Sequence, residues 1–306
     1  MTIEKAVILP PLSRRRRESR RVDLFPYLLI LPAVVILGVI FLYPLGYSLW
    51  LSFFSLNLNR PSRGMPFVGF DNYIDVLTDP AFYHALWLTV YWSVGSVGGQ
   101  LIFGLVAALA LNQTFPGRAI ARAVILVPWA VPTVLVAIVF GTMFNTQGII
   151  NELLIDAGVI SDYIPWLSST QWSMPTLIIA NIWKGFPFVA VMLLAGLQAI
   201  PNELYEAAKV DGASEWNQFR FITLPGLRSV MAVTVLLSII FSLKSVDFQY
   251  IMTYGGPADS TKVIAFDAYF TAFAEFMFGK ASAIATILTL ITAGVSFIYL
   301  KQRGVE

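Results

Sequence analysis

The sequence predicts an all-α polytopic membrane protein in which six transmembrane helices are joined by short loops. Hydrophobic residues make up 57% of the 306 residues and charged residues only 12%, about half the charged share of a soluble domain. The apolar residues gather into runs of about 20 or more, the length that a helix needs to cross a bilayer. Lysines and arginines are concentrated in alternate loops between these runs. These three observations argue against an ordinary soluble domain.

Six segments meet the length and hydropathy requirements of a span. They are residues 27–50, 85–111, 119–144, 174–198, 226–254 and 281–300. The first is too long for the apolar part of a secretory signal and no small-residue cleavage site follows it, so we expect a retained helix. The chain is thereby divided into a basic N-terminal tail (1–26), a transmembrane domain (27–300) and a C-terminal tail (301–306).

The distribution of positive charge predicts the orientation of the chain in the membrane. Six spans place both termini on one side, and 14 of the 20 lysines and arginines belong to the tails and loops of that side. The opposite loops carry only four, which are Arg60, Arg63, Lys262 and Lys280. Because loops rich in lysine and arginine stay in the cytoplasm, both termini are expected to be cytoplasmic. The arginine cluster at residues 14–21 then marks topology, and we expect no nucleic-acid partner.

The residue types that enzymes and metal sites need are scarce. The chain has no cysteine and a single histidine, His84, so it offers neither thiolate ligands nor a histidine cluster for a metal. It has no GxxxxGK[ST] sequence to hold nucleotide phosphates and no recognisable nucleophile–base arrangement. We therefore expect a chain without catalytic residues, bound metal or cofactor of its own.

The longest inner loop, residues 200–226, is predicted to form two short helices. Asn202 is expected to cap the first helix. Gly212 can turn the chain without the steric cost of a Cβ atom. Ser214 is expected to cap the second helix, and Pro225 to end it. A helix pair of this kind suits docking into a groove on another protein.

Seven positions in this loop carry a recognisable signature. They are Glu206, Ala207, Ala208, Gly212, Ile222, Leu224 and Pro225. Their identities and spacing resemble the EAA-x3-G-x9-I-x-LP signature of ABC-importer permeases. The resemblance implies a type I ABC importer permease whose loop is a cytoplasmic coupling helix seated in a cleft of an ATPase. It also implies that the glutamate pairs with polar or basic groups of the ATPase, that the alanines pack closely and that the glycine makes the turn.

Further segments resemble carbohydrate permeases of the maltose-type group. They are FVGFDNY (67–73), IWKGFPF (182–188) and VDFQYIMTYGGP (246–257). In the last segment Tyr254 stands where the family's TGGGP turn has a glycine. The resemblance implies a permease of the inner membrane that translocates a sugar or sugar derivative by alternating access.

The resemblance also implies the partners of the chain. Six helices form half of a typical ABC translocation unit, so a second permease, homologous but distinct, is expected to form a heterodimer with this one. Two copies of a cytosolic ATPase would bind ATP and Mg and drive transport. A periplasmic or lipid-anchored binding protein would deliver the sugar, and membrane lipid would surround the helices.

Polar residues at membrane depth indicate where the cargo passes. An ionisable group in the hydrocarbon layer is costly and usually faces a protein interior or an aqueous cavity. In the fourth span, Asn181, Lys184 and Phe188 recur at helical spacing and share a face. In the fifth span, the apolar run 230–243 is too short to cross the bilayer, so the helix is expected to continue through the polar residues that follow.

We expect these two faces to line a translocation cavity, where aromatic rings stack on sugar rings and polar groups bind hydroxyls. The candidate substrate residues are Asn181, Trp183, Lys184, Lys244, Asp247, Gln249 and Tyr250. Two alternatives stay open. The lysine at 244 and the aspartate at 247 could neutralise each other for structural reasons only. The lysines could instead serve an anionic phospho- or sulfo-sugar, although the aspartate offsets one positive charge.

Two other classes of membrane protein predict different features from those of an ABC permease. An ion-coupled secondary carrier would place coupling carboxylates in the broken helices of inverted repeats. This sequence has one acid within its spans and no recognisable inverted repeat. A structural scaffold would have no use for an exposed coupling loop. Both alternatives predict that no ATPase accompanies the chain.

Overall fold

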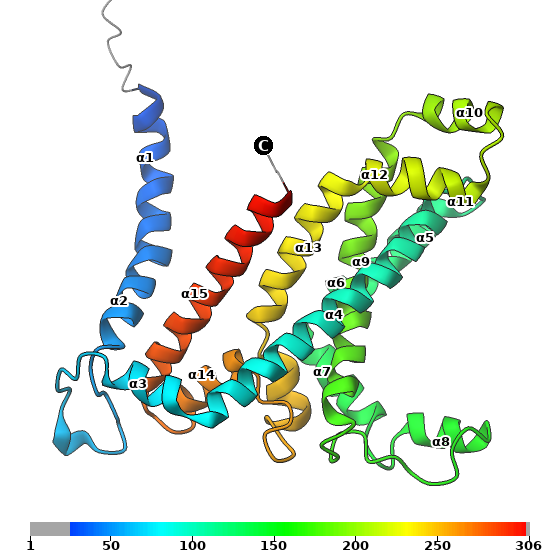
Figure 1. The fold of residues 1–306 in the computed structure, drawn as a ribbon. Coiled ribbons are helices and arrows are strands. Elements are labelled where there is room, and N and C mark those ends of the chain that lie inside the picture. Colours follow the sequence, from blue (N-terminus) through cyan, green and yellow to red (C-terminus); the bar gives the residue numbers. More distant parts are fainter. Residues whose placement is uncertain (1–24, 304–306) are drawn as a thin grey trace, which may run out of the picture. The chain divides into compact units, whose positions relative to one another are not determined.

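The computed structural model describes residues 25–303, and helices dominate this part of the chain (Figure 1). Beside the helices, the described residues form two isolated β-bridges, Phe54 with Phe67 and Asn57 with Met277. Residues 1–24 of the predicted basic tail and residues 304–306 of the predicted C-terminal tail lie outside the described residues.

The chain divides into two compact units, and the first ends at Tyr47. It holds α1 (Phe25–Leu37), the π-helix η1 (Gly38–Leu42) and the start of α2 (Tyr43–Leu51). The helical stretch Leu28–Leu51 is long and apolar enough to cross a membrane. It matches the first predicted span.

The second unit holds three continuous helices long enough to cross a membrane. They are α4 (Pro80–Asn112), α9 (Ser173–Gln198) and α15 (Phe278–Arg303), and they match the second, fourth and sixth predicted spans. The second span begins earlier than predicted, because Asp79 caps it by accepting a hydrogen bond from the N–H of Ala81 (2.9 Å). In α9 the helix continues through Pro187.

The third predicted span is broken, so the prediction of a single helix over 119–144 is wrong. The segment forms α5 (Arg118–Ile125), α6 (Val127–Ala130) and α7 (Thr133–Met143), with a bend of 88° between α6 and α7. Val131 and Pro132 adopt extended backbone at the break. A proline lacks the helical N–H and disfavours helical geometry in the residue before it, which explains the break.

The fifth predicted span is also broken, so the prediction of a continuous helix over 226–254 is wrong. A bend of 65° separates the coupling-loop stretch Glu215–Gly226 from α13 (Arg228–Leu243) at the start of this span. Residues 244–246 are not helical, and the π-helix η4 (Gln249–Thr253) comes after them. Because the helix stops at Leu243, the polar residues beyond it do not continue its face. If each bent pair counts as one span, the described residues contain six spans, as predicted.

Short elements lie at the end of the helices opposite the coupling loop (Figure 1). They are η2 (Pro61–Arg63), α3 (Asp71–Thr78), α8 (Ile149–Asp156) and α14 (Ile264–Phe273). Helix α3 ends at Thr78, and α4 starts almost directly after it. The loop around α8 is held by Asn151, which is fully buried and satisfies both its donors and its acceptor. Its amide nitrogen donates to the carbonyls of Thr146 and Ile164, and its oxygen accepts from the Ile164 N–H and from the Trp166 indole.

Two groups at this end have shifted pKa values. A hydrogen bond to Glu152 (2.8 Å) raises the pKa of the Tyr163 hydroxyl. Partial burial lowers the pKa of Lys262, but its ion pair with Asp267 (3.1 Å) and the nearby charges of Asp259 and Glu275 together outweigh this effect, and the net pKa is raised. The ion pair ties the start of α14 to the chain before it.

Close packing between α4 and α9 forms the centre of the second unit. Gly95, Gly99 and Gly104 on α4 leave no room for a Cβ atom, because side chains of α9 lie against them. Around this contact the buried cluster includes Trp92 of α4 and Phe248 of the fifth span, whose rings are 6.1 Å apart. The indole of the tryptophan donates to the carbonyl of Ser242 (3.1 Å), which fixes α13 to α4.

Candidate translocation cavity and coupling loop

A cavity of about 410 Å³ lies among α4, α6, α7, α9 and the broken fifth span. Four of the predicted substrate residues line it: Asn181 and Lys184 from α9, and Lys244 and Asp247 from the break after α13. Lys244 lies in the non-helical backbone at 244–246 and Asp247 directly after it, so part of this lining is irregular backbone. Irregular backbone at membrane depth is tolerated where it lines such a cavity.

The other three predicted substrate residues lie outside this cavity. Gln249 is fully buried, and neither its amide nitrogen nor its oxygen has a hydrogen-bond partner. Trp183 packs against Phe140 (5.4 Å between ring centroids). Tyr250 packs against Tyr269, also at 5.4 Å. Gln249 and Tyr250 were predicted to line the cavity because the fifth helix was expected to be unbroken. Trp183 was included because it lies beside the polar face of α9.

The charged groups of the cavity are arranged differently from a simple ion pair. The ammonium of Lys184 donates to the carbonyl oxygen of Trp129 (2.6 Å), at the end of α6. Among residues 25–303, the ion pairs within 4.0 Å are Lys262 with Asp267 and Lys280 with Asp79. Lys244 and Asp247 therefore form no ion pair within 4.0 Å in this structure, and both line the cavity.

Several lining residues were not among the candidates predicted from the sequence. They are Gln100, Trp129, Thr133, Gly185, Ser238, Phe241, Ser242, Ser245 and Phe248, whereas Phe188 belongs to the face of α9 that was predicted to line the cavity. Gln100 was detectable as an isolated amide within an apolar span, and its nitrogen donates to the carbonyl of Asn181 (3.1 Å). The aromatic contributions from the third and fifth spans depend on the breaks in those spans, which the hydropathy pattern does not show.

Aromatic rings form one wall of the cavity. Trp129 and Phe188 are nearly parallel, with centroids 6.1 Å apart and 23° between their planes. Phe241 meets the phenylalanine edge-on at 6.0 Å. Flat apolar faces beside amide, hydroxyl and charged groups can bind the two kinds of surface that a polyhydroxylated ring offers. Within the described residues, no group of three or more His, Cys, Asp or Glu comes together to hold a metal ion.

The coupling loop joins α9 to α13 through α10 (Asn202–Val210), α11 (Glu215–Gln218), the π-helix η3 (Phe219–Thr223) and α12 (Leu224–Gly226). Gly212 has a φ of +77°, the left-handed conformation predicted for the turn. Ser214 caps α11 by accepting a hydrogen bond from the Asn217 N–H (3.3 Å), as predicted.

One detail of the loop was predicted wrongly. Asn202 is the first residue of α10, and the capping position is Pro201. Pro225 lies one residue before the end of the helical stretch Glu215–Gly226, close to where the second helix was predicted to end, and α13 follows after a bend of 65°. The chain therefore continues from α11 almost directly into the fifth span.

The loop presents part of its signature to solvent and anchors the rest. Glu206 and Ala207 are exposed, and Ala208 is half-buried. Ile222 packs against a buried cluster that includes Leu197 of α9 and Leu227. The hydroxyls of Tyr205 and Thr223 are 3.0 Å apart and join α10 to η3. A force applied to α10 would thus reach both α9 and α13.

Comparison with known proteins identifies the class of this chain. Residues 100–303 match the family model of the binding-protein-dependent transport system inner membrane component. The chain belongs to this family. It is therefore a permease subunit of an ABC importer, a transport component and not an enzyme, and the membrane location predicted from the sequence is confirmed.

Individual relatives cover almost the whole permease. The chain is 38% identical to the trehalose/maltose transport system permease protein MalF of Thermococcus litoralis, over 90% of this chain and 92% of the relative. It is 36% identical to the sulfoquinovosyl glycerol transport system permease protein SmoG of Agrobacterium fabrum, over 91% and 90%. It is 33% identical to the inner membrane ABC transporter permease protein YcjO of Escherichia coli, over 93% and 96%.

The fold is similar to that of solved ABC transporters. A chain of a bacterial ABC transporter involved in the import of the acidic polysaccharide alginate superimposes with a TM-score of 0.77 at 23% identity, covering 92% of this chain and 95% of that chain. At this identity the similarity establishes the fold alone. The predicted fold, a six-span permease of a type I ABC importer, is confirmed.

Proposed function

We propose that the chain carries a neutral sugar or oligosaccharide across the membrane through the cavity between α9 and the broken fifth span. The observation that carries this proposal is the meeting of Asn181, Lys184, Lys244 and Asp247 beside an aromatic wall. These groups come from two spans, and their polar atoms face a cavity at membrane depth. The names of relatives that transport trehalose, maltose and maltodextrin favour the same substrate class.

ATP hydrolysis by a partner drives this transport in the proposal. The exposed Glu206 and Ala207 of α10 dock into the ATPase. The ATPase binds ATP and Mg. Two ATPase copies serve two permeases, this chain and a homologous partner. Because η3 and α12 lead directly into α13, movement of α10 reaches the residues that line the cavity.

The proposed orientation places the coupling loop and both termini in the cytoplasm. Lysines and arginines are concentrated at that end of the helices. The opposite end, with α3, α8 and α14, then faces outward and receives sugar from a binding protein. A solved relative of the same fold is an alginate transporter in complex with an alginate pentasaccharide-bound periplasmic protein, which supports this arrangement of partners.

Uptake measurements on cavity variants test the substrate assignment. A hydrogen bond to a charged group contributes about 1.5–3 kcal/mol, so Asp247→Asn should weaken the apparent affinity for sugar about tenfold or more. Asn181→Ala should weaken it by a smaller factor. The matched control is Asp75→Asn on the exposed surface of α3, which should leave uptake unchanged. Unaltered uptake in both cavity variants would refute the assignment.

A further inference from the structure

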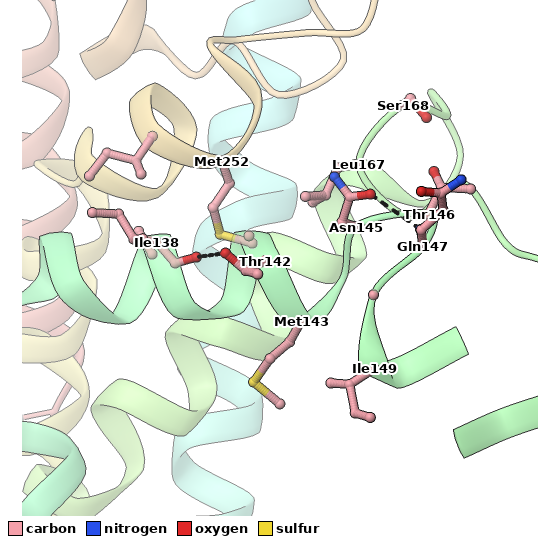
Figure 2. Close-up of a pocket in the computed structure, with 14 residues that line it drawn as sticks. Ile138, Thr142, Met143, Asn145, Thr146, Gln147, Ile149, Leu167, Ser168 and Met252 are labelled. Atoms are coloured by element: carbon pink, nitrogen blue, oxygen red, sulfur yellow. Dashed lines mark hydrogen bonds between the residues drawn. The ribbon is translucent and has the colours of Figure 1, made fainter. Parts of the chain in front are cut away.

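A second, larger cavity opens at the outer end of α7, away from the coupling loop. Its volume is about 820 Å³, and residues from α7, the following loop and η4 line it. Figure 2 shows Ile138, Thr142 and Met252 on one side, with Asn145, Gln147 and Ser168 across from them. The function proposed above makes no use of this cavity, and it shares no lining residue with the membrane cavity.

The chemistry of this outer cavity is neutral and polar. None of its lining residues carries a charge. Among the described residues, the Gln147 amide and the Ser168 hydroxyl make no side-chain hydrogen bond that would occupy them. Asn145 uses its oxygen to accept from the Gln147 N–H (3.2 Å), which leaves its amide nitrogen free to donate. Such a set can exchange hydrogen bonds with hydroxyl groups but offers no counter-charge to an anion.

The carboxyl end of α7 brings backbone carbonyls beside the same cavity. Gly148 is buried because the carbonyl oxygens of Thr142, Met143 and Asn145 converge on it, with the first only 2.6 Å from where a Cβ would lie. The Thr142 carbonyl accepts from the Asn145 N–H (3.3 Å) and the Asn145 carbonyl accepts from the Gly148 N–H (2.8 Å), and carbonyl groups at the carboxyl end of a helix carry partial negative charge. They favour ligands that donate hydrogen bonds and disfavour anions. Apolar surface from Met143, Met252 and Leu167 completes the lining.

The two cavities follow one another along the same two segments. On α7, Thr133 lines the membrane cavity, while Ala137 and Gly141, one and two turns further, line the outer one. On the fifth span, Asp247 lines the first cavity and Met252 the second.

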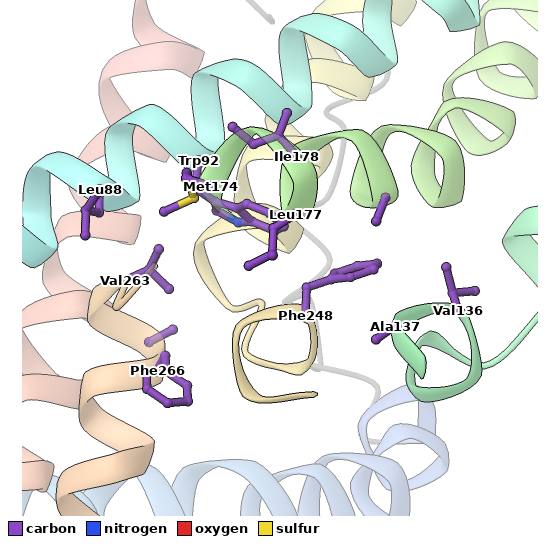
Figure 3. Close-up of a cluster of buried hydrophobic side chains, with 12 residues drawn as sticks. Leu88, Trp92, Val136, Ala137, Met174, Leu177, Ile178, Phe248, Val263 and Phe266 are labelled. Atoms are coloured by element: carbon purple, nitrogen blue, oxygen red, sulfur yellow. The ribbon is translucent and has the colours of Figure 1, made fainter. Parts of the chain in front are cut away.

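A thin apolar layer separates the two cavities. Figure 3 shows the ring of Phe248 extending toward Val136 and Ala137 of α7. Phe248 is only 1% exposed, and it also lines the membrane cavity. A sugar in the outer cavity would therefore be one side-chain layer away from the groups that bind it inside the membrane.

We propose that the outer cavity is a second sugar subsite, which holds a neutral sugar through Asn145, Gln147 and Ser168 before the Phe248 layer opens. The inference rests on the proposed sugar function and adds a site to it. The subsite selects for neutral polyhydroxylated ligands, since it has hydrogen-bonding groups and no cationic side chain. It binds sugar independently of the charged residues in the membrane cavity.

The absence of cysteine from the chain permits a direct test. Gln147→Cys and the nearly isosteric Ser168→Cys place one thiol in the outer cavity, and Ser245→Cys places one in the membrane cavity. The control is Val159→Cys, an exposed position of the same outer loop that does not line the cavity. Each variant is assembled with its partners in nanodiscs and labelled with a maleimide, with maltose, trehalose or glucose 6-phosphate present.

A neutral sugar at ten times its Kd should slow labelling about tenfold at both outer positions, because labelling follows the unoccupied fraction. Glucose 6-phosphate should not, and the Val159→Cys control should label at the same rate throughout. Protection at the outer positions should persist when Asp247→Asn is added. Protection at Ser245→Cys alone would overturn the outer subsite and leave the sugar function standing. Protection at no position, together with no sugar uptake, would overturn both.

Discussion

Gln249 holds a buried amide that has no hydrogen-bond partner, although Asp247 and Phe248 directly before it line the membrane cavity. A buried amide without partners costs about 1–3 kcal/mol. Gln249→Leu removes that cost, so we expect the free energy of unfolding in detergent to stay the same or to rise by about 1 kcal/mol. Gln100→Leu is the matched comparison, because it deletes an amide that is bonded to the Asn181 carbonyl. That variant should be less stable, and a strong loss of stability in Gln249→Leu would contradict this account.

Asn151 is the opposite case, a buried amide with every partner in place. Asn151→Leu leaves the Ile164 N–H and the Trp166 indole without an acceptor. We expect a local loss of about 3 kcal/mol or more from these two donors and the two lost carbonyl contacts. Hydrogen–deuterium exchange of residues 145–166 should accelerate. Glu152→Gln alters an exposed hydrogen bond to Tyr163 and should change exchange little. Equal exchange in both variants would show that Asn151 does not hold the loop around α8.

The sequence predicted the charged cavity residues better than the uncharged ones. Lys184, Lys244 and Asp247 stand out because a charge in an apolar run needs a polar surrounding, and all three line the cavity. Gln249 and Tyr250 were assigned by extending a helix that in fact stops. Neutral residues carry no comparable penalty in the sequence, so only the backbone path shows which of them face the cavity.

At the scale of the helices, close contact between α4 and α9 depends on glycine. A Cβ at Gly104 would lie 2.6 Å from Val189 Cγ1 and 3.2 Å from the backbone nitrogen of Ala190, whereas a Cβ at Gly98 would have nothing within 4 Å. We expect Gly104→Ala to destabilise the protein by about 1–3 kcal/mol through overpacking. Gly98→Ala, with the same chemical change, should be neutral or slightly stabilising. Thermal unfolding of both variants measures the difference, and equal effects would contradict the packing described.

The breaks in the third and fifth spans explain why the helices were only partly predictable. Hydropathy identified six apolar segments, because the cost of exposing polar backbone to lipid forces each one to be helical over most of its length. It could not locate the breaks at Val131 and Lys244, since an apolar residue before a proline and a lysine after an apolar run each also occur in continuous helices. Both breaks border the cavity, where tertiary contacts compensate for the lost helical hydrogen bonds.

For the whole molecule, the coupling loop is the proposed point of contact with the ATPase. Glu206→Lys reverses the charge on an exposed position of α10, away from the buried clusters. Like charges placed across an interface oppose association strongly, so the amount of ATPase that co-purifies should fall at least about tenfold. Asp162→Lys, an exposed charge reversal at the opposite end, is the control and should leave co-purification intact. If the Glu206→Lys variant retains the ATPase fully, Glu206 is not part of the interface.

Sugar uptake into proteoliposomes is the most direct test of the whole account. The chain is reconstituted with its partner permease, the ATPase and the binding protein, and radiolabelled sugar is supplied on the side of α8. We predict uptake that requires ATP on the side of the coupling loop and that stops when the ATPase is omitted. Uptake driven by an ion gradient without any ATPase would contradict the account.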